Sequence, residues 1–300
     1  MDTNILLENG TNELEILEFM LDDNCYGINV AKISEIIPYQ SVTPVPNAHP
    51  SIEGIFMPRD TMITAISLKN CLQRGTQDDK GLFIITNFNK LDIAFHVDSV
   101  SGIHRVSWRD IIKPNATVNN ADVGVSTGIV KYDDKLVIIL DFEKIVSDIA
   151  PETGLKIEEI KELGERERRD IPILMAEDSA LLNKLISDSL KEAGYVNLID
   201  CVNGQEAWDF ISNAAEEGNV YEKVRCVITD IEMPIMDGHR LTKLIKSTDA
   251  TKNLPVVIFS SLVNEEMRRK GEQLGANAQL SKPEIGNLVR VIDDLIEESK

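Results

Sequence analysis

The chain of 300 residues has the length of two average domains, and its hydrophobic (43%) and charged (27%) fractions are those of a folded protein. Its 31 basic and 50 acidic residues give a formal net charge of −19, which argues against binding to nucleic acid or anionic lipid. The longest uninterrupted apolar run is five residues, Leu136 to Leu140, whereas a membrane-spanning helix needs about 20. We therefore expect a cytoplasmic protein with no direct membrane insertion.

Residues 1–150 are predicted to be rich in β-structure, because short apolar stretches alternate with turn residues. Four prolines between residues 38 and 50 exclude a central strand in that connection. Closely spaced short strands favour a sandwich or barrels over a parallel sheet. Three hairpins are expected, formed by residues 14–21 with 25–30, 82–86 with 91–97, and 128–132 with 135–140.

This half shows no catalytic or metal-binding pattern, which is typical of a binding module. Met57-Pro58-Arg59-Asp60 predicts an exposed turn between two strands. Arg59 could bind a carboxylate of a partner protein, or it could pair internally with Asp60 or Glu53. The sequence leaves both alternatives open.

Residues 151–170 are densely charged and connect the two halves. Glu162 with Arg166 and Glu165 with Arg169 are spaced as favourable pairs along a helix. A thin apolar stripe accompanies them, consisting of Leu155, Ile157, Ile160 and Leu163. The segment is predicted to be a solvated helical linker, and a disordered charged tether is the alternative.

Residues 171–300 alternate between strand and helix patterns. Strands are expected at 171–176, 196–201, 224–229, 255–259 and 278–280, and helices at 179–193, 204–217, 238–247, 265–274 and 285–298. Two of the strands are continuously apolar, as strands covered on both faces must be. Five such repeats predict an α/β doubly wound domain with a five-stranded parallel sheet.

Polar residues gather where these strands end, which is where ligands bind in open α/β sheets. Glu177-Asp178, Asp230, Ser260 and Lys282 each follow a different predicted strand. Clustered carboxylates repel one another, and oxygen ligands suit Mg²⁺, which removes that conflict. A carboxylate beside Mg²⁺ and a lysine can accept a phosphoryl group. Any one of these acids alone is more often a helix cap, but together they predict a phosphoacceptor site.

Residues 171–300 resemble a response-regulator receiver domain. The matching motifs are Glu177-Asp178, Asp230 followed by Met233-Pro234 and Asp237-Gly238, then Ser260, and Lys282-Pro283. The resemblance implies that a histidine kinase phosphorylates Asp230 and that Ser260 and Lys282 contact the phosphoryl group. It also implies Mg²⁺ held by Asp178, Asp230 and the backbone carbonyl of Glu232, with Glu177 acting through water.

The chain departs from the receiver pattern at Gln279, three residues before the lysine. Members of the family often have an aromatic switch residue at this position. The sequence therefore does not predict how the phosphorylated domain changes its output.

Residues 14–148 resemble a CheW-like chemotaxis coupling domain. The match includes Phe19-Met20-Leu21, Tyr26-Gly27-Ile28, Pro44-Val45-Pro46-Asn47, Gly54-Ile55 and the retained Arg59. This resemblance implies two small SH3-like β-barrels of five strands each. It also implies simultaneous binding to methyl-accepting chemoreceptors and to the regulatory domain of their histidine kinase, at membrane-associated receptor arrays.

Together the two halves resemble CheV-type chemotaxis proteins, with a coupling domain at 1–150, a linker at 151–170 and a receiver at 171–300. We expect an adaptor whose coupling is regulated by phosphorylation of Asp230. The first alternative is a phosphate sink docked at the receptor–kinase complex. A distant third is an aspartyl-phosphate hydrolase, which usually needs a second Asp where this chain has Glu232.

Overall fold

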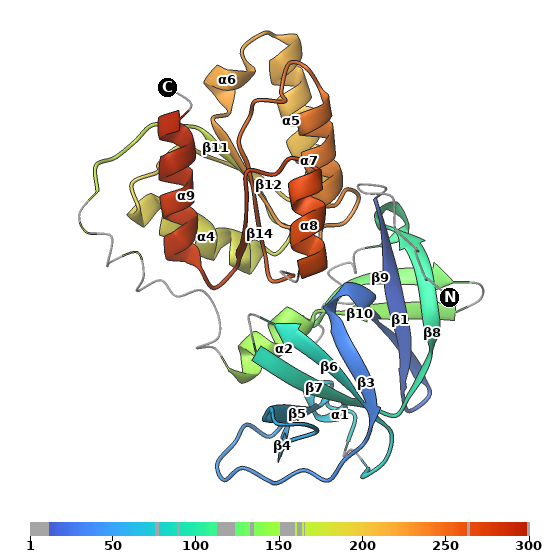
Figure 1. Cartoon of the computed structure of the whole chain (residues 1–300). Coiled ribbons are helices and arrows are strands. Elements are labelled where there is room, and N and C mark those ends of the chain that lie inside the picture. Colours follow the sequence, from blue (N-terminus) through green and yellow to red (C-terminus); the bar gives the residue numbers. More distant parts are fainter. Residues whose placement is uncertain are drawn as a thin grey trace. The chain divides into compact units, whose positions relative to one another are not determined.

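The structure, a computed structural model, describes residues 12–75, 78–88, 91–112, 124–132, 135–150, 160, 164, 166–262 and 265–298 (Figure 1). They form two compact units, Leu14–Pro151 and Glu152–Lys300, the second of which includes the first 13 residues of the chain. Every helix in the described part is too short or too polar to cross a lipid bilayer.

The first unit begins with a five-stranded sheet in the order β8-β1-β2-β10-β9. Its strands are β1 (Glu13–Leu21), β2 (Asn24–Asn29), β8 (Ser99–Ser107), β9 (Ser126–Tyr132) and β10 (Lys135–Leu140). Two of the predicted hairpins, β1 with β2 and β9 with β10, are confirmed as antiparallel pairs. Asp22 turns the first of them with a φ of 53°, a left-handed conformation that Asp tolerates.

A second five-stranded sheet follows, in the order β3-β6-β7-β5-β4. Its strands are β3 (Ile33–Pro38), β4 (Ile52–Phe56), β5 (Ile63–Ser67), β6 (Leu82–Phe88) and β7 (Leu91–Val97), and β6 with β7 is the third predicted hairpin. The proline-rich connection leaves from β3 at the sheet edge, where missing N–H donors interrupt no ladder. Short helical segments complete the unit: η1 (Val30–Lys32), α1 (Leu68–Cys71), η2 (Trp108–Asp110) and α2 (Phe142–Ile149).

The two sheets share one hydrophobic core. Phe19 of β1 and Phe95 of β7 are fully buried in it, and Phe142 of α2 packs against both rings, with centroid distances of 6.3 and 4.7 Å. Aromatic rings of this size contribute large buried areas, so α2 joins the two halves of the unit.

The second unit is built on a wholly parallel sheet in the order β12-β11-β13-β14-β15. Its strands are β11 (Ile173–Ala176), β12 (Leu198–Cys201), β13 (Cys226–Thr229), β14 (Val256–Ser260) and β15 (Ala278–Ser281). Its helices are α4 (Ala180–Glu192), α5 (Gly204–Glu216), α6 (Val220–Lys223), α7 (Gly238–Ser247), α8 (Glu265–Gln273) and α9 (Ile285–Glu298). Separate cores on the two faces, one with α4 and α9 and one with α5 and α7, confirm the predicted doubly wound fold.

The linker contributes described residues to this second unit. Ile160 is 2% exposed within the core that includes α4 and α9. Arg166 and Arg169 bind Asp293 of α9 at 2.6 and 2.9 Å, and the Tyr195 hydroxyl donates to the same carboxylate at 2.6 Å. Ile160, Arg166 and Arg169 therefore fold with the receiver unit and are not part of a free tether.

The remaining linker residues on which the helix prediction depends lie outside the described part of the chain, namely Leu155, Ile157, Glu162, Leu163 and Glu165. The limits 1–150, 151–170 and 171–300 stay predictions.

Candidate functional site

Parallel strands bring three carboxylates together at one edge of the receiver sheet. Ala176 of β11 lies beside Thr229 of β13, so the residues that follow these strands become neighbours. Glu177, Asp178 and Asp230 each place one ligand oxygen within 4.8 Å of the others'. Glu177 and Asp230 are buried, and Asp178 is partly exposed. The structure thus brings together the acids that the strand pattern grouped.

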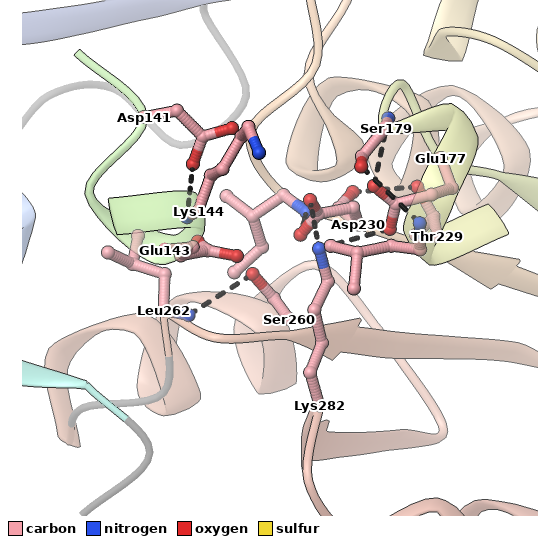
Figure 2. A network of polar contacts seen from close by, with 12 residues as sticks. Asp141, Glu143, Lys144, Glu177, Ser179, Thr229, Asp230, Ser260, Leu262 and Lys282 are labelled. Carbon is pink, nitrogen blue, oxygen red and sulfur yellow. Dashed lines mark hydrogen bonds and ion pairs between the residues drawn. The ribbon is translucent and has the colours of Figure 1, made fainter. Parts of the chain in front are cut away.

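Lys282 is the cation at this site, and it reaches the acids from the end of β15 (Figure 2). Its Nζ lies 2.8 Å from Asp230 Oδ2 and 3.0 Å from Glu177 Oε2, and its side chain is almost completely buried. The other oxygen of Asp230 accepts a hydrogen bond of 2.7 Å from the Ile231 N–H. Both oxygens are therefore held, and the carboxylate has a fixed orientation.

The charge at the site is unbalanced. Burial raises the pKa of Glu177 to about 8. The positive charge of Lys282 lowers this pKa, but burial together with the negative charges of Asp230 and Asp178 outweighs it. Three carboxylates beside one buried ammonium make a donor set of oxygens with excess negative charge, which fits a hard divalent cation such as Mg²⁺. Glu232 lies in the loop after Asp230 and is partly exposed, and the role of its carbonyl stays a prediction.

The loop after β13 passes very close to the backbone of Asp230, for a reason that the sequence alone did not show. A Cβ on Gly238 would lie 1.9 Å from the Asp230 carbonyl oxygen, so only glycine fits. The Thr229 hydroxyl donates to the same carbonyl at 2.8 Å. The Asp237 carboxylate caps the N-terminus of α7 by accepting a hydrogen bond of 2.7 Å from the Arg240 N–H. The motif Asp237-Gly238 thus has a local structural reason.

Ser260 ends β14 and is fully buried. Its Oγ accepts a hydrogen bond of 3.2 Å from the Leu262 N–H, within its own loop (Figure 2). The structure therefore places Ser260 at the correct strand end, and its hydroxyl oxygen is engaged by the loop.

Arg59 lies in the predicted turn between β4 and β5, and its side chain is 78% exposed. Its guanidinium pairs with Glu35 of β3 at 2.9 Å. The internal partners named from the sequence, Asp60 and Glu53, were wrong, and Glu53 instead contacts His96 at 2.9 Å. Glu35 was missed because it is distant in sequence and is brought close only by the sheet. A role of Arg59 in binding a partner stays a prediction.

Two families match this chain, in the order that the two units suggest. A CheW-like domain matches residues 15–150, and a response regulator receiver domain matches residues 173–293. The chain is 25% identical to chemotaxis protein CheV3 of Helicobacter pylori over 305 residues, covering 96% of each. It is 29% identical to CheV2 of the same organism over 300 residues, covering 91% of this chain and 92% of that protein.

The order of the two domains and the similarity over almost the whole chain support a CheV-type chemotaxis protein. Its first half alone is 29% identical over 150 residues to chemotaxis protein CheW of Thermotoga maritima, covering 50% of this chain and 98% of that protein. The two domains and these relatives support a chemotaxis coupling adaptor that carries a receiver domain.

Proposed function

We propose that this CheV-type protein couples methyl-accepting chemoreceptors to their histidine kinase, and that phosphorylation of Asp230 regulates the coupling. The observation that carries the proposal is the buried Asp230 carboxylate, oriented by Lys282 and Ile231, in a chain that also has a CheW-like domain. One polypeptide thus joins a docking module to a phosphoacceptor.

The transfer would begin with an attack of a carboxylate oxygen of Asp230 on the phosphorus of a phosphohistidine. A P–O bond forms, the P–N bond breaks, and the imidazole nitrogen keeps the electron pair and takes up a proton. Lys282, 2.8 Å from the acceptor, can donate to a phosphoryl oxygen and offset part of the added charge. Asp178, Asp230 and Glu177 would hold Mg²⁺, which when bound supplies further neutralisation of the phosphoryl oxygens.

Phosphorylation changes the hydrogen-bonding demand at the site. The new phosphoryl oxygens need donors, and the Ser260 hydroxyl can supply one by turning away from the Leu262 N–H. That motion pulls on the loop between β14 and α8. Regulation requires that the two receiver states bind the coupling partners with different affinity.

Phosphotransfer is tested by incubating the chain with Mg²⁺ and radiolabelled phosphorylated kinase. Asp230→Asn should abolish base-labile label, and Lys282→Ala should retain some label but lose its effect on partner binding. Asp209→Asn, at an exposed position of α5, is the matched control and should label normally. Undiminished label in Asp230→Asn would overturn the assignment.

The sink alternative is separated by measuring receptor-stimulated kinase activity when no other receiver is present. A regulated coupler responds to Asp230→Asn under this condition, whereas a sink that only drains phosphoryl groups does not.

Arg59→Ala tests docking in the same assay, with Glu35→Gln as its control. If Arg59 exchanges Glu35 for a carboxylate of the partner, Arg59→Ala weakens binding and Glu35→Gln does not.

A further inference from the structure

The residue that comes just before β1 in the chain is held within the receiver unit. Asn12 belongs to the same compact unit as residues 152–300, and it is 8% exposed. Its Nδ2 donates a hydrogen bond of 2.8 Å to the Ile235 carbonyl, and its Oδ1 accepts one of 3.0 Å from the Asp237 N–H. One carboxamide thus binds two backbone groups of the loop between β13 and α7, which lie 223 and 225 residues away in the sequence.

The backbone on both sides of this contact is in the left-handed region. Asn12 has a φ of 67°, which asparagine adopts more readily than most residues. Ile235 has a φ of 70°, which is costly for a β-branched side chain, and it is 45% exposed. Because little apolar burial offsets this cost, the hydrogen bond from Asn12 to the Ile235 carbonyl helps to hold the loop in its strained form.

The same loop is connected to the phosphoacceptor by hydrogen bonds. The Ile231 N–H donates to the Asp230 carboxylate at 2.7 Å, and the Ile231 carbonyl accepts from the Gly238 N–H at 3.0 Å. Gly238 follows Asp237, whose N–H donates to Asn12. A continuous run of backbone contacts therefore leads from the Asp230 carboxylate to the Asn12 carboxamide.

Phosphorylation would weaken the first contact in this run. In an aspartyl phosphate, one oxygen of Asp230 is bonded to phosphorus and the other is a neutral carbonyl, so neither carries the charge of the carboxylate. A hydrogen bond to a charged acceptor is about twice as strong as one to a neutral acceptor. The Ile231 N–H is then bound less tightly, and the loop can leave its strained conformation at Ile235.

We propose that Asn12 is a latch, which docks the N-terminal segment of the chain on the β13–α7 loop while Asp230 is unphosphorylated and is released by phosphorylation. Glu13, the first residue of β1, follows Asn12 directly, and Leu14 is buried in the coupling domain. The latch therefore connects the receiver with the first strand of the coupling domain, independently of residues 151–170. The proposal rests on the proposed function, because it takes Asp230 as the phosphoacceptor, and it names a contact through which the regulation acts.

The test follows hydrogen exchange of the Asp237 backbone N–H by NMR in the full chain, with Mg²⁺ alone and with Mg²⁺ plus beryllofluoride, a phosphoryl mimic that binds aspartate carboxylates. Asn12→Gly removes the carboxamide, and glycine keeps the left-handed conformation without strain. This variant should raise the exchange rate of the Asp237 N–H about tenfold. Beryllofluoride should bring the wild type close to the same rate. Asn197→Ala, which removes an exposed amide that donates to Asp170, is the control and should leave the rate unchanged.

A regulatory role has a second readout, which a purely structural contact would not change. This readout is the affinity of the full chain for the regulatory domain of the kinase. Beryllofluoride should change this affinity in the wild type. Asn12→Gly should have the affinity of the beryllofluoride-bound wild type in both conditions, because its latch is already open.

The outcomes separate this proposal from the proposed function. Unchanged Asp237 exchange in Asn12→Gly overturns the latch and leaves Asp230 as the acceptor. Unchanged exchange in the wild type with beryllofluoride bound at Asp230 overturns the release, as does a response of Asn12→Gly affinity as large as that of the wild type. If beryllofluoride fails to bind the wild type, Asp230 as the acceptor and the release of the latch both fail.

Discussion

Lys282 contacts two acidic side chains in a buried site. Its Nζ is 2.8 Å from Asp230 and 3.0 Å from Glu177, and all three side chains are nearly inaccessible to solvent. Removing one member of such a cluster leaves the others uncompensated, which is more damaging than losing an exposed ion pair.

We therefore expect Lys282→Met to lower the unfolding free energy by about 3 kcal/mol in a chelating buffer, as for a broken buried pair. Excess Mg²⁺ should restore part of the loss, because the cation neutralises the same carboxylates. Urea denaturation with and without Mg²⁺ is the measurement. Lys252→Met, which breaks an exposed pair with Asp249, should change stability by less than about 1 kcal/mol. An unchanged Lys282→Met midpoint in chelator would contradict the electrostatic role.

His239, in the first turn of α7, makes receiver stability depend on pH. Burial lowers the pKa of His239 to about 3, with the positive charge of Lys270 adding to the effect, and its Nε2 has no partner. The unfolded chain binds a proton near pH 6.5 and the folded chain does not, so the contribution is complete above pH 6.5 and is lost as pH falls. The expected loss approaches roughly 1.4 kcal/mol per pH unit between these two values.

Stability of the receiver is followed by the fluorescence of Trp208 in a Trp108→Phe background, because the chain has two tryptophans. His239→Leu should flatten the acid-side slope relative to the parent chain. A slope equal to that of the parent would show that His239 is not neutral in the fold.

At the scale of elements, Gly271 and Gln279 couple α8 to β15. Gly271→Ala should be destabilising with Gln279 present, because the new Cβ meets Oε1 at 2.4 Å. With Gln279→Ala the same change should stabilise the chain, by up to about 1 kcal/mol of helix propensity. A double-mutant cycle by thermal unfolding measures this coupling, and additive effects would show that the two residues act independently.

Elements with a strong local pattern could be predicted from the sequence. The apolar stretches on either side of Asp22 predict the β1–β2 hairpin. The apolar run at the start of β14 predicts a strand that is covered on both faces. The acids of the site could be grouped because parallel strands end at one edge. The partners of Arg59 and of Asp293 could not be predicted, because they are distant in sequence. Only folding brings Glu35 to Arg59, and only folding brings Arg166 and Tyr195 to Asp293.

At the scale of the whole molecule, three described residues of the linker, Ile160, Arg166 and Arg169, contribute to the stability of the receiver. Burial of Ile160 and the two arginine contacts to Asp293 imply that a fragment of residues 152–300 is more stable than one of 171–300. We expect a difference of about 2–5 kcal/mol, from one buried isoleucine and the loss of charge partners at Asp293. Urea denaturation followed by Trp208 measures it, and Asp293→Asn in the longer fragment should reproduce part of the loss. Equal midpoints for the two fragments would contradict a structural linker.

We propose that the charge state of Asp230 sets how tightly the chain binds its coupling partners. The most direct measurement is the affinity of the full chain for the regulatory domain of the kinase and for receptor fragments, with Mg²⁺ alone and with Mg²⁺ plus beryllofluoride. We expect beryllofluoride, a phosphoryl mimic, to change the affinity of the wild type at least severalfold and to leave Asp230→Asn unaffected. Identical affinities of the wild type in both conditions, with beryllofluoride demonstrably bound at Asp230, would contradict it.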